Sequence, residues 1–247
     1  MLYLNKGDNM KKIAIFSDIH GNLQALNSIV EDIDKDSFDE VIFLGDVVGA
    51  GPNPKECLDI LMDSNIKVVK GNHEIYQTDY DLANNLLSLN EIEHRNWIHD
   101  QLDEEEIKYL KNLPMEYEEL IYGKLFNFSH FFLNNSKNYF ESLNVLGDKR
   151  VFNTFRKIEN DYMFIGHSHS PFQIINTSLL TCVGSSGCRK NNSTFYTILE
   201  VDSNDVRITK KEIVYDRKAF EKEIKNKDYP DRERLADIFF GIKIKED

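Results

Sequence analysis

The sequence lacks the features that mark several classes of protein. No apolar run approaches the roughly 18 residues that a membrane-spanning helix needs, so no membrane partner is expected. The first residues, MLYLNKGDNMKK, have no apolar centre, and a secretory signal is therefore not expected either. Only three cysteines are present (Cys57, Cys182 and Cys188), without CxxC spacing. This pattern favours reduced thiols in a cytoplasmic protein over a disulfide framework.

Basic charge is also scarce. The formal net charge is -12, which argues against nucleic acid as a partner, because proteins that bind its phosphate backbone usually carry a basic stripe. There is no GxxxxGK[ST] phosphate-binding loop, and Gly49-Ala50-Gly51 is followed by Pro-Asn-Pro, so it does not make GxGxxG. With 41% hydrophobic and 29% charged residues, the chain can bury a sizeable core. We expect one domain over 10–247 and a disordered extension over 1–9, because the chain from Met10 runs directly into a strand.

Short apolar segments alternate with helical patterns in the first part of the chain. Residues 13–17, 41–44 and 66–69 are predicted as buried parallel strands. An amphipathic helix over 23–34 separates the first two strands, and a helix that begins at Pro54 separates the second and third. This order predicts a parallel, right-handed α/β sheet.

Strands dominate the later part of the chain. After a mainly helical insert over 75–124, in which Tyr76, Tyr80 and Trp97 either wall a site or pack on the sheet, seven strands are predicted: 120–122, 125–128, 162–165, 172–176, 179–183, 194–201 and 206–214. From 217 we expect a charged, peripheral helix. Two strand-rich halves around one core predict an α/β fold, a four-layer αββα sandwich of two mixed β-sheets flanked by helices.

Polar side chains follow five of the predicted strands, namely Asp18 with His20, Asp46, Asn72 with His73, His130, and His167 with His169. Ligands bind at the carboxyl ends of parallel strands, where loops converge. Asp18 and His20 should point to the same side, because residues i and i+2 of an extended segment do so. One such Asp alone is more often a turn or cap residue, but the whole set supplies oxygen and nitrogen ligands for two divalent ions.

These motifs, in this order, resemble those of the calcineurin-like metallophosphoesterases over about residues 12–200. The matching segments are Asp18-x-His20, Gly45-Asp46, Gly71-Asn72-His73-Glu74, His130 and Gly166-His167-x-His169, and His167-Ser168-His169-Ser170-Pro171 is similar to the small bacterial phosphoesterases. The resemblance implies one metal held by Asp18, His20, Asp46 and His169. It implies a second metal held by Asp46, Asn72, His130 and His167, with Asp46 bridging.

The implied reaction is hydrolysis of a phosphate ester by a metal-bridging hydroxide that attacks phosphorus. His73 and Asp46 would be catalytic, with His73 protonating the leaving oxygen as an imidazolium. We expect manganese in vitro, although iron, zinc, nickel and cobalt suit the same nitrogen and oxygen ligands. The segment after Asp46 lacks the arginine of phosphoprotein phosphatases and dinucleoside tetraphosphatases, so a small phosphomonoester or phosphodiester is the expected substrate.

Two residues are candidates for contact with the substrate phosphate, each with an alternative. Arg189 belongs to a glycine-rich loop, Gly184–Arg189, which is either a phosphate-binding loop or an ordinary hairpin turn. Asn22 is either a helix N-cap or a substrate contact.

Two other functions remain open. A non-catalytic scaffold of this fold usually loses metal ligands, and none is lost here. A nuclease would fit the motifs, but the acidic charge counts against it. A homo-oligomer is compatible with the sequence.

Overall fold

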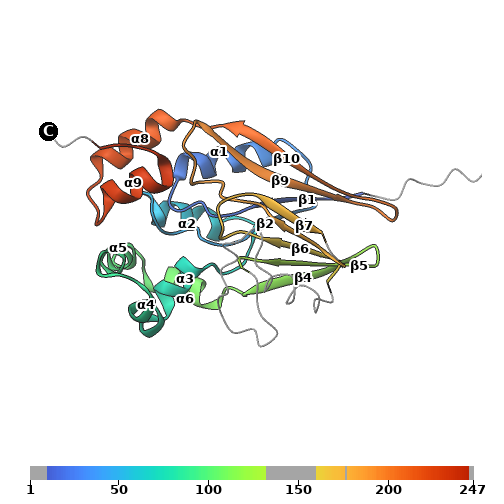
Figure 1. Cartoon of the computed structure of the whole chain (residues 1–247), viewed down its shortest axis with the longest axis horizontal. Coiled ribbons are helices and arrows are strands. Elements are labelled where there is room, and N and C mark those ends of the chain that lie inside the picture. The colour runs from blue at the N-terminus through green and yellow to red at the C-terminus, as the bar shows by residue number, and fades with distance from the viewer. Residues whose placement is uncertain (1–9, 132–159, 176, 245–247) are drawn as a thin grey trace, which may run out of the picture.

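Two β-sheets lie face to face at the centre of the molecule, which is a computed structural model that describes residues 10–131, 160–175 and 177–244 (Figure 1). The first five-stranded sheet has the order β10-β9-β1-β2-β3, and the second has the order β4-β5-β6-β8-β7. Both are mixed: β1 pairs in parallel with β2 and antiparallel with β9, while β6 pairs in parallel with β8 and β7 antiparallel with β8. The predicted α/β class, with two mixed sheets and flanking helices, is confirmed.

The first sheet is built around β1 (Lys11–Phe16), whose two faces are both buried. Ile13 and Ile15 pack toward Phe126 and Phe128 of the second sheet. Ala14 and Phe16 face the opposite way, against helices α1 (Leu23–Ile33) and α2 (Pro54–Met62). The continuous apolar run predicted as a buried strand therefore serves two hydrophobic layers.

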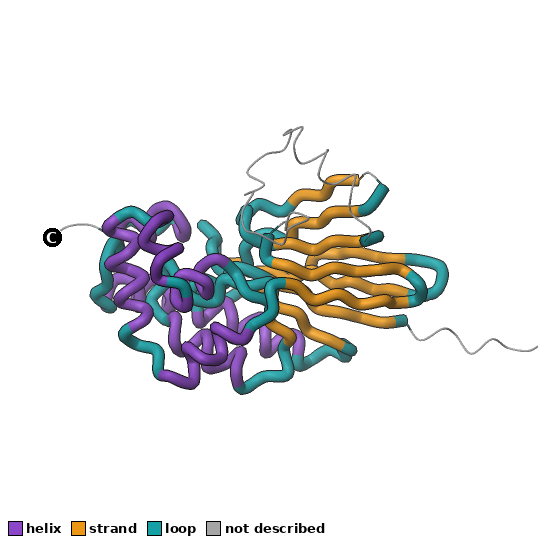
Figure 2. Tube along the Cα trace, turned by 90° about the horizontal axis from the view of Figure 1, so that it is seen from below, coloured by secondary structure: helices purple, strands orange, loops and turns teal. Residues whose placement is uncertain are grey.

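The remaining strands follow the predicted order. In the first sheet they are β2 (Glu40–Phe43), β3 (Lys67–Val68), β9 (Ser193–Val201) and β10 (Val206–Val214). In the second sheet they are β4 (Glu116–Ile121), β5 (Lys124–Ser129), β6 (Tyr162–Ile165), β7 (Phe172–Ile175) and β8 (Leu179–Cys182). Figure 2 shows the helices gathered at one end of the molecule and the strands extending from the other.

The predicted insert over 75–124 is helical in its larger part. Four helices occupy it or overlap its start: α3 (Asn72–Thr78), α4 (Tyr80–Leu86), α5 (Leu89–His99) and α6 (Glu104–Asn112). Its last residues belong to the second sheet, because β4 pairs with β5 from Glu116 onward. The end of the insert is therefore part of the sandwich. The division of the chain into an extension over 1–9 and one domain over 10–247 stays a prediction.

The prediction of a single peripheral helix from 217 is wrong. The segment forms two helices, α8 (Arg217–Asn226) and α9 (Arg232–Phe240). Phe220, Ile224 and Phe240 are buried and form a cluster with Ala25 of α1 and Ala50 of the loop after β2. The charged residues of α8 occupy its outer side, but its apolar face is part of the core.

Among the described residues, no helix is both long and apolar enough to cross a membrane.

Candidate metal centre

The first four predicted metal residues lie together at the carboxyl ends of β1, β2 and β6. The Nε2 atoms of His20 and His169 are 3.0 Å apart. Asp18 Oδ1 lies 3.3 Å from His169 Nε2 and 3.8 Å from His20 Nε2. Asp46 Oδ2 lies 3.6 Å from His20 Nε2, so two imidazoles and two carboxylates meet at one point.

The other predicted metal residues meet next to this point, on the far side of Asp46. Asp46 Oδ2 lies 3.1 Å from His130 Nε2. Asn72 Oδ1 lies 3.1 Å from the same His130 nitrogen and 2.9 Å from His167 Nδ1. The same oxygen of Asp46 therefore faces both groups of residues.

These residues converge for a different reason from the predicted one. Asp18 and His20 are predicted to lie in an extended segment, but their φ angles are +54° and +48°. Asp46, His167 and His169 also have φ between +57° and +63°. This left-handed conformation is uncommon for residues with a Cβ and is concentrated at functional sites. The prediction that Asp18 and His20 share one side of an extended segment is therefore wrong in its backbone geometry, although the two side chains do meet.

Backbone hydrogen bonds between distant loops hold this geometry. The N–H of Asp18 donates to the Gly45 carbonyl at 3.0 Å, and that of His20 to the Asp46 carbonyl at 3.0 Å. From the other side, the N–H of Gly187 and the Ser185 hydroxyl both donate to the Asp18 carbonyl. Each loop at the centre is thereby fixed by its neighbours.

Glu74 is a supporting residue that the sequence analysis missed. Its buried carboxylate accepts four backbone N–H groups, from Asp46 (2.7 Å), Val47 (2.9 Å), Val48 (3.3 Å) and Gly71 (2.8 Å). The sequence could have indicated this role, since Glu74 directly follows the predicted site residues Asn72 and His73. Glu74 holds the loop that carries Asp46.

The pKa shifts in the centre keep its two carboxylates, Asp18 and Asp46, ionised. Burial opposes ionisation of Asp18, yet His130 and His169 lower its pKa to about 2. Burial likewise opposes charge on His130, but Asp46 and Asp18 raise its pKa to about 9. Burial and His73 lower the pKa of His20 to about 3, and burial and His130 lower that of His167 to about 4. The carboxylates are thus anionic and attract positive charge to the place where they meet.

The residues fit divalent metal ions. Asp18 Oδ1 is buried without a hydrogen-bond partner among the described residues, which a cation would correct. Imidazole nitrogens combined with carboxylate and amide oxygens are the ligands of manganese, iron, zinc, cobalt and nickel sites. His130 Nδ1 faces the Leu44 carbonyl at 2.6 Å, a second-sphere contact typical of a metal-bound histidine. Since such a ligand coordinates in its neutral form, a cation here would displace the proton on His130.

His73 stands beside these residues and contacts the centre in two ways. Its backbone N–H donates to Asp46 Oδ1 at 2.9 Å, and its ring lies edge-on to His20 with centroids 4.8 Å apart. Gly49 makes room for it, because a Cβ at this position would lie 2.5 Å from His73 Nδ1. Burial lowers the pKa of the His73 imidazole, while Asp46 opposes that shift.

The two predicted phosphate contacts are engaged elsewhere. Asn22 is fully buried: its side-chain oxygen caps α1 by accepting from the Ala25 N–H, and its amide nitrogen donates to the Gly187 carbonyl. The Arg189 guanidinium donates to Ser193 and Glu212 and lies over the Phe195 ring. These contacts support the N-cap alternative for Asn22. The Arg189 side chain contacts residues of β9 and β10, so both side chains already have protein partners.

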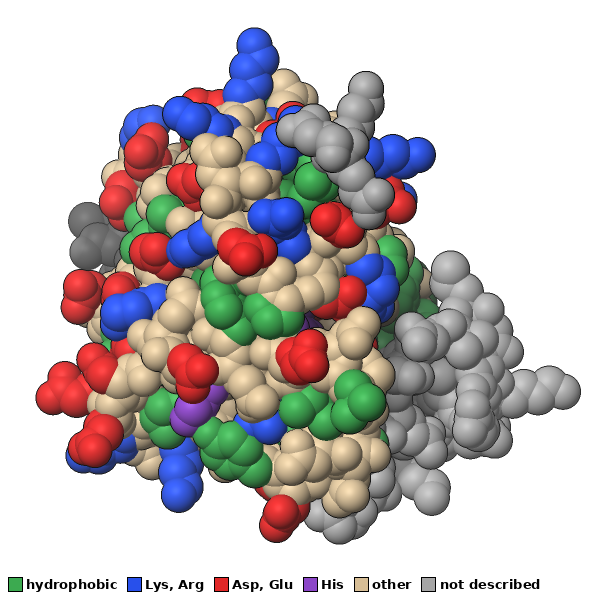
Figure 3. All heavy atoms as spheres, turned by 90° about the vertical axis from the view of Figure 1, so that its left-hand side faces the viewer, with side chains coloured by type: hydrophobic (Ala, Val, Ile, Leu, Met, Phe, Trp, Pro, Cys, Tyr) green, Lys and Arg blue, Asp and Glu red, His purple; other side chains and the backbone are tan. Residues whose placement is uncertain are grey.

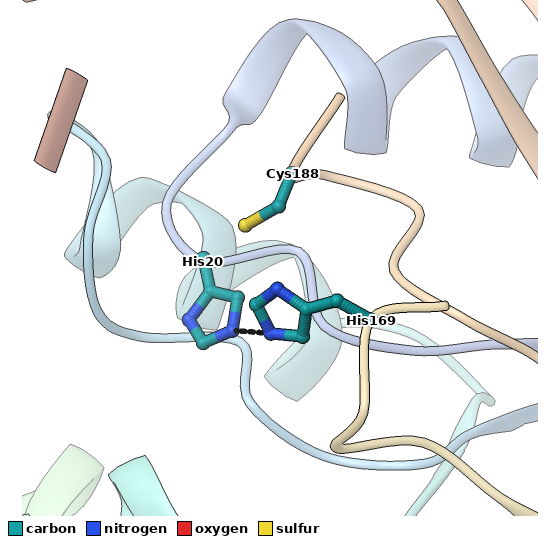
Figure 4. Close-up of side chains that lie close together, drawn as sticks. All are labelled: His20, His169 and Cys188. Carbon is teal, nitrogen blue, oxygen red and sulfur yellow. Dashed lines mark hydrogen bonds between the residues drawn. The ribbon is translucent and has the colours of Figure 1, made fainter. Parts of the chain in front are cut away.

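Two further side chains border the centre, and no sequence motif indicates that they lie there. The Sγ atom of Cys188 and ring nitrogens of His20 and His169 lie within 4.8 Å of one another (Figure 4). The Phe239 ring from α9 lies 5.7 Å from that of His20 and 5.6 Å from that of His169. The C-terminal segment therefore forms part of the wall of the centre.

The chain is similar to known proteins. Residues 11–174 match the family model described as calcineurin-like phosphoesterase. The chain is 33% identical over 239 residues to the uncharacterized protein MJ0912 of Methanocaldococcus jannaschii, which covers 87% of this chain and 93% of that protein. The chain therefore belongs to the calcineurin-like phosphoesterase family, as its motifs predicted. Family membership supports a phosphoester hydrolase in general.

Solved structures also share the fold, and two of them illustrate the likeness. A metallophosphoesterase from Sphaerobacter thermophilus superimposes with a TM-score of 0.71 at 24% identity, over 92% of this chain and 99% of that one. The hypothetical protein PH1004 from Pyrococcus horikoshii gives a TM-score of 0.76 at 20% identity, over 94% of this chain and 99% of that one. At these identities the likeness shows the fold alone.

Proposed function

We propose that this protein is a dinuclear metal-dependent phosphoesterase that hydrolyses small phosphomonoesters or phosphodiesters. One observation carries the proposal: Asp46 Oδ2 lies 3.6 Å from His20 Nε2 and 3.1 Å from His130 Nε2. A single carboxylate oxygen that faces two sets of nitrogen and oxygen ligands is suited to bridge two cations.

The predicted metal ligands would be distributed between two ions as the motifs imply. Asp18, His20 and His169 would hold one ion, and Asn72, His130 and His167 the other, with Asp46 shared. When bound, two divalent ions supply Lewis acidity that lowers the pKa of water and stabilises charge on phosphoryl oxygens. Manganese is our choice for assays, because carboxylate and amide oxygens suit it.

His73 would donate a proton to the leaving group. Its imidazole lies beside the His20 ring, close enough to the centre for this role. Burial lowers the pKa of His73, but a substrate phosphate next to the ring would favour the protonated form. The protonated ring could then donate to the leaving oxygen.

Hydrolysis of p-nitrophenyl phosphate and bis-p-nitrophenyl phosphate tests the proposal. With manganese, the wild type should cleave at least one of them, and His73→Ala should lower kcat by about 10²–10⁴-fold. Asp46→Asn should lower both the activity and the metal content. His99→Ala is the control, because His99 contacts Tyr80 on the helical insert and should leave the activity unchanged.

The alternatives have their own outcomes in the same assay. If the wild type is no more active than His73→Ala with manganese, iron, zinc, nickel or cobalt, the protein is a scaffold of this fold. Cleavage of single- or double-stranded DNA in preference to the small esters would favour the nuclease. A small-molecule partner, a cytoplasmic location and a homo-oligomer stay predictions.

A further inference from the structure

A cavity of about 240 Å³ adjoins the centre on the side of His73. Helices α3, α5 and α9 contribute its walls, with Asn72 and His73 at one part and Tyr76, Leu235 and Phe239 among its apolar lining. At about 30 Å³ per water molecule, the volume corresponds to roughly eight waters, the size of one substituted ring. Figure 3 faces the end of the molecule that α5 and α9 form, where hydrophobic side chains lie among acidic and basic ones.

Arg95 lines this cavity and is only 5% exposed. Its Nε and Nη1 atoms are buried and have no hydrogen-bond partner among the described residues. Its other contacts are weak ones: Nη2 donates to Asn84 at 3.3 Å, and the guanidinium lies 4.3 Å from the Tyr80 ring centroid. A buried guanidinium is always charged, and it is costly to bury without an anion.

The acidic residues of the lining do not neutralise Arg95. Asp231 forms an ion pair with Arg234, whose guanidinium also lies 4.0 Å from Glu91. Glu91 in turn accepts hydrogen bonds from Ser88. No carboxylate of the described part of the chain lies within 4.0 Å of Arg95, so the lining keeps one uncompensated positive charge.

Two buried acceptors belong to residues of the same lining. The Gln77 Oε1 and His94 Nε2 atoms lack partners among the described residues, and both side chains line the cavity. The Nδ1 of His94 lies 3.1 Å from the Pro230 carbonyl, which makes Nδ1 the donor and leaves Nε2 as an acceptor. Unpartnered buried donors and acceptors in one cavity indicate a polar ligand, because native proteins satisfy nearly all such groups.

We infer that this cavity binds the alcohol part of the phosphate ester, a group of one ring that carries an anionic oxygen group opposite Arg95. The inference rests on the proposed function, since the ester phosphate would occupy the adjoining metal centre. A carboxylate or a second phosphate would each supply the anion that the Arg95 guanidinium lacks among its protein contacts. The substrate class is therefore an anionic aryl-type or similarly sized ring phosphate.

Four esters test this class with the manganese-loaded enzyme: phenyl phosphate, 3-carboxyphenyl phosphate, 4-carboxyphenyl phosphate and 1,4-phenylene bisphosphate. The wild type should have a higher kcat/KM for the carboxyphenyl or bisphosphate esters than for phenyl phosphate. The preference is the kcat/KM for the anionic ester divided by the kcat/KM for phenyl phosphate. Arg95→Met should lower this ratio about 10- to 100-fold, the range for one charged hydrogen-bonded contact. Whichever anionic ester shows the preference identifies the group as carboxylate or phosphate.

Arg207→Met is the matched control, because the Arg207 side chain is 62% exposed on β10 and pairs with Glu200. It should leave the ratio as in the wild type. The inference is overturned if neither anionic ester is preferred over phenyl phosphate, or if Arg95→Met keeps the preference.

Binding separates this inference from the proposed function. Calorimetric titration of the metal-free protein with 4-carboxyphenyl phosphate should give tighter binding than with phenyl phosphate, even if no ester is hydrolysed. If Arg95→Met does not fold, Ile238→Trp replaces it, because Ile238 lines the cavity yet is 54% exposed. Crowding the cavity in this way should weaken binding of 4-carboxyphenyl phosphate, and unchanged binding would contradict the assignment.

Discussion

Replacement of Glu74 by Gln tests whether one buried carboxylate supports the whole centre. Oε2 accepts from the N–H groups of Asp46 and Gly71, and Oε1 accepts from those of Val47 and Val48. A glutamine keeps one oxygen and turns an NH₂ group toward the other two donors. Glu74→Gln therefore removes two of the four bonds and sets donor against donor.

The expected loss of stability follows from these bonds. A hydrogen bond to a charged acceptor contributes about 1.5–3 kcal/mol, so two lost bonds cost at least about 3 kcal/mol. The Asp46 loop should also relax from its left-handed conformation at φ +61°, which the bonds now hold in place. We expect weaker metal binding as a consequence, because Asp46 is the residue that both predicted ion sites share.

Urea denaturation of the metal-free protein measures the first effect, and metal content after purification measures the second. The experiment is done at pH 8, because burial and Asp46 raise the pKa of Glu74 to about 7. The urea midpoint should fall with an unchanged m-value. Glu105→Gln, on the exposed side of α6, is the control and should change stability by less than about 0.5 kcal/mol. If Glu74→Gln behaves like Glu105→Gln in both measurements, the supporting role of Glu74 is refuted.

Three further predictions concern the centre and its surroundings. Gly49→Ala should lower kcat at least about 10-fold, because the new Cβ would lie 2.5 Å from His73 Nδ1. Gly123→Ala, where φ is also positive but nothing lies within 4 Å, should leave kcat unchanged, and equal effects would contradict the steric argument. Chelation of the metal should lower Tm and added manganese should restore it, since a ligand that binds only the folded state stabilises it; a Tm indifferent to both would count against a metal site. Burial and His73 lower the pKa of His94 from 6.5 to about 4, so the unfolded state binds the extra proton and stability falls as the pH drops from 6.5 to 4. His94→Asn should lack up to ~3 kcal/mol of this loss, and parallel pH–stability curves for the two proteins would disprove it.

The strands of both sheets were predicted well from the sequence, because the apolar pattern of a strand depends on which of its faces are buried. The short apolar run that contains Ile13 and Ile15 favours a strand buried on both faces, and the observed β1 is buried in that way. The polar residues that follow the strands do meet, at the carboxyl ends of strands from both sheets, as the general rule for ligand binding at strand ends predicts.

The conformation of the site loops could not be predicted from local sequence. Asp18 and His20 adopt left-handed backbones because their N–H groups bond to Gly45 and Asp46, which lie far along the chain. The preference of each residue on its own is the opposite one, so the extended geometry was the natural expectation. Tertiary hydrogen bonds overrode it.

The role of the C-terminal segment was missed for a similar reason. The spacing of Phe220 and Ile224 on α8 could have shown that one face of this helix is buried. Nothing in the adjacent pair Phe239 and Phe240 distinguishes the ring that packs in the core from the ring that borders His20 and His169. Only the position of α9 against the centre decides it.

These features make the stability of the fold and the binding of metal depend on each other. Five of the seven predicted metal residues have left-handed backbones, each of which costs about 1–3 kcal/mol. The backbone bonds to Asp18 and the carboxylate of Glu74 offset that cost before any ion binds. A cation then adds the contacts that buried Asp18 Oδ1 lacks. A mutation that weakens a supporting bond should therefore lower metal affinity even when the metal residues themselves are unchanged, because those residues hold their ligand geometry only through their neighbours.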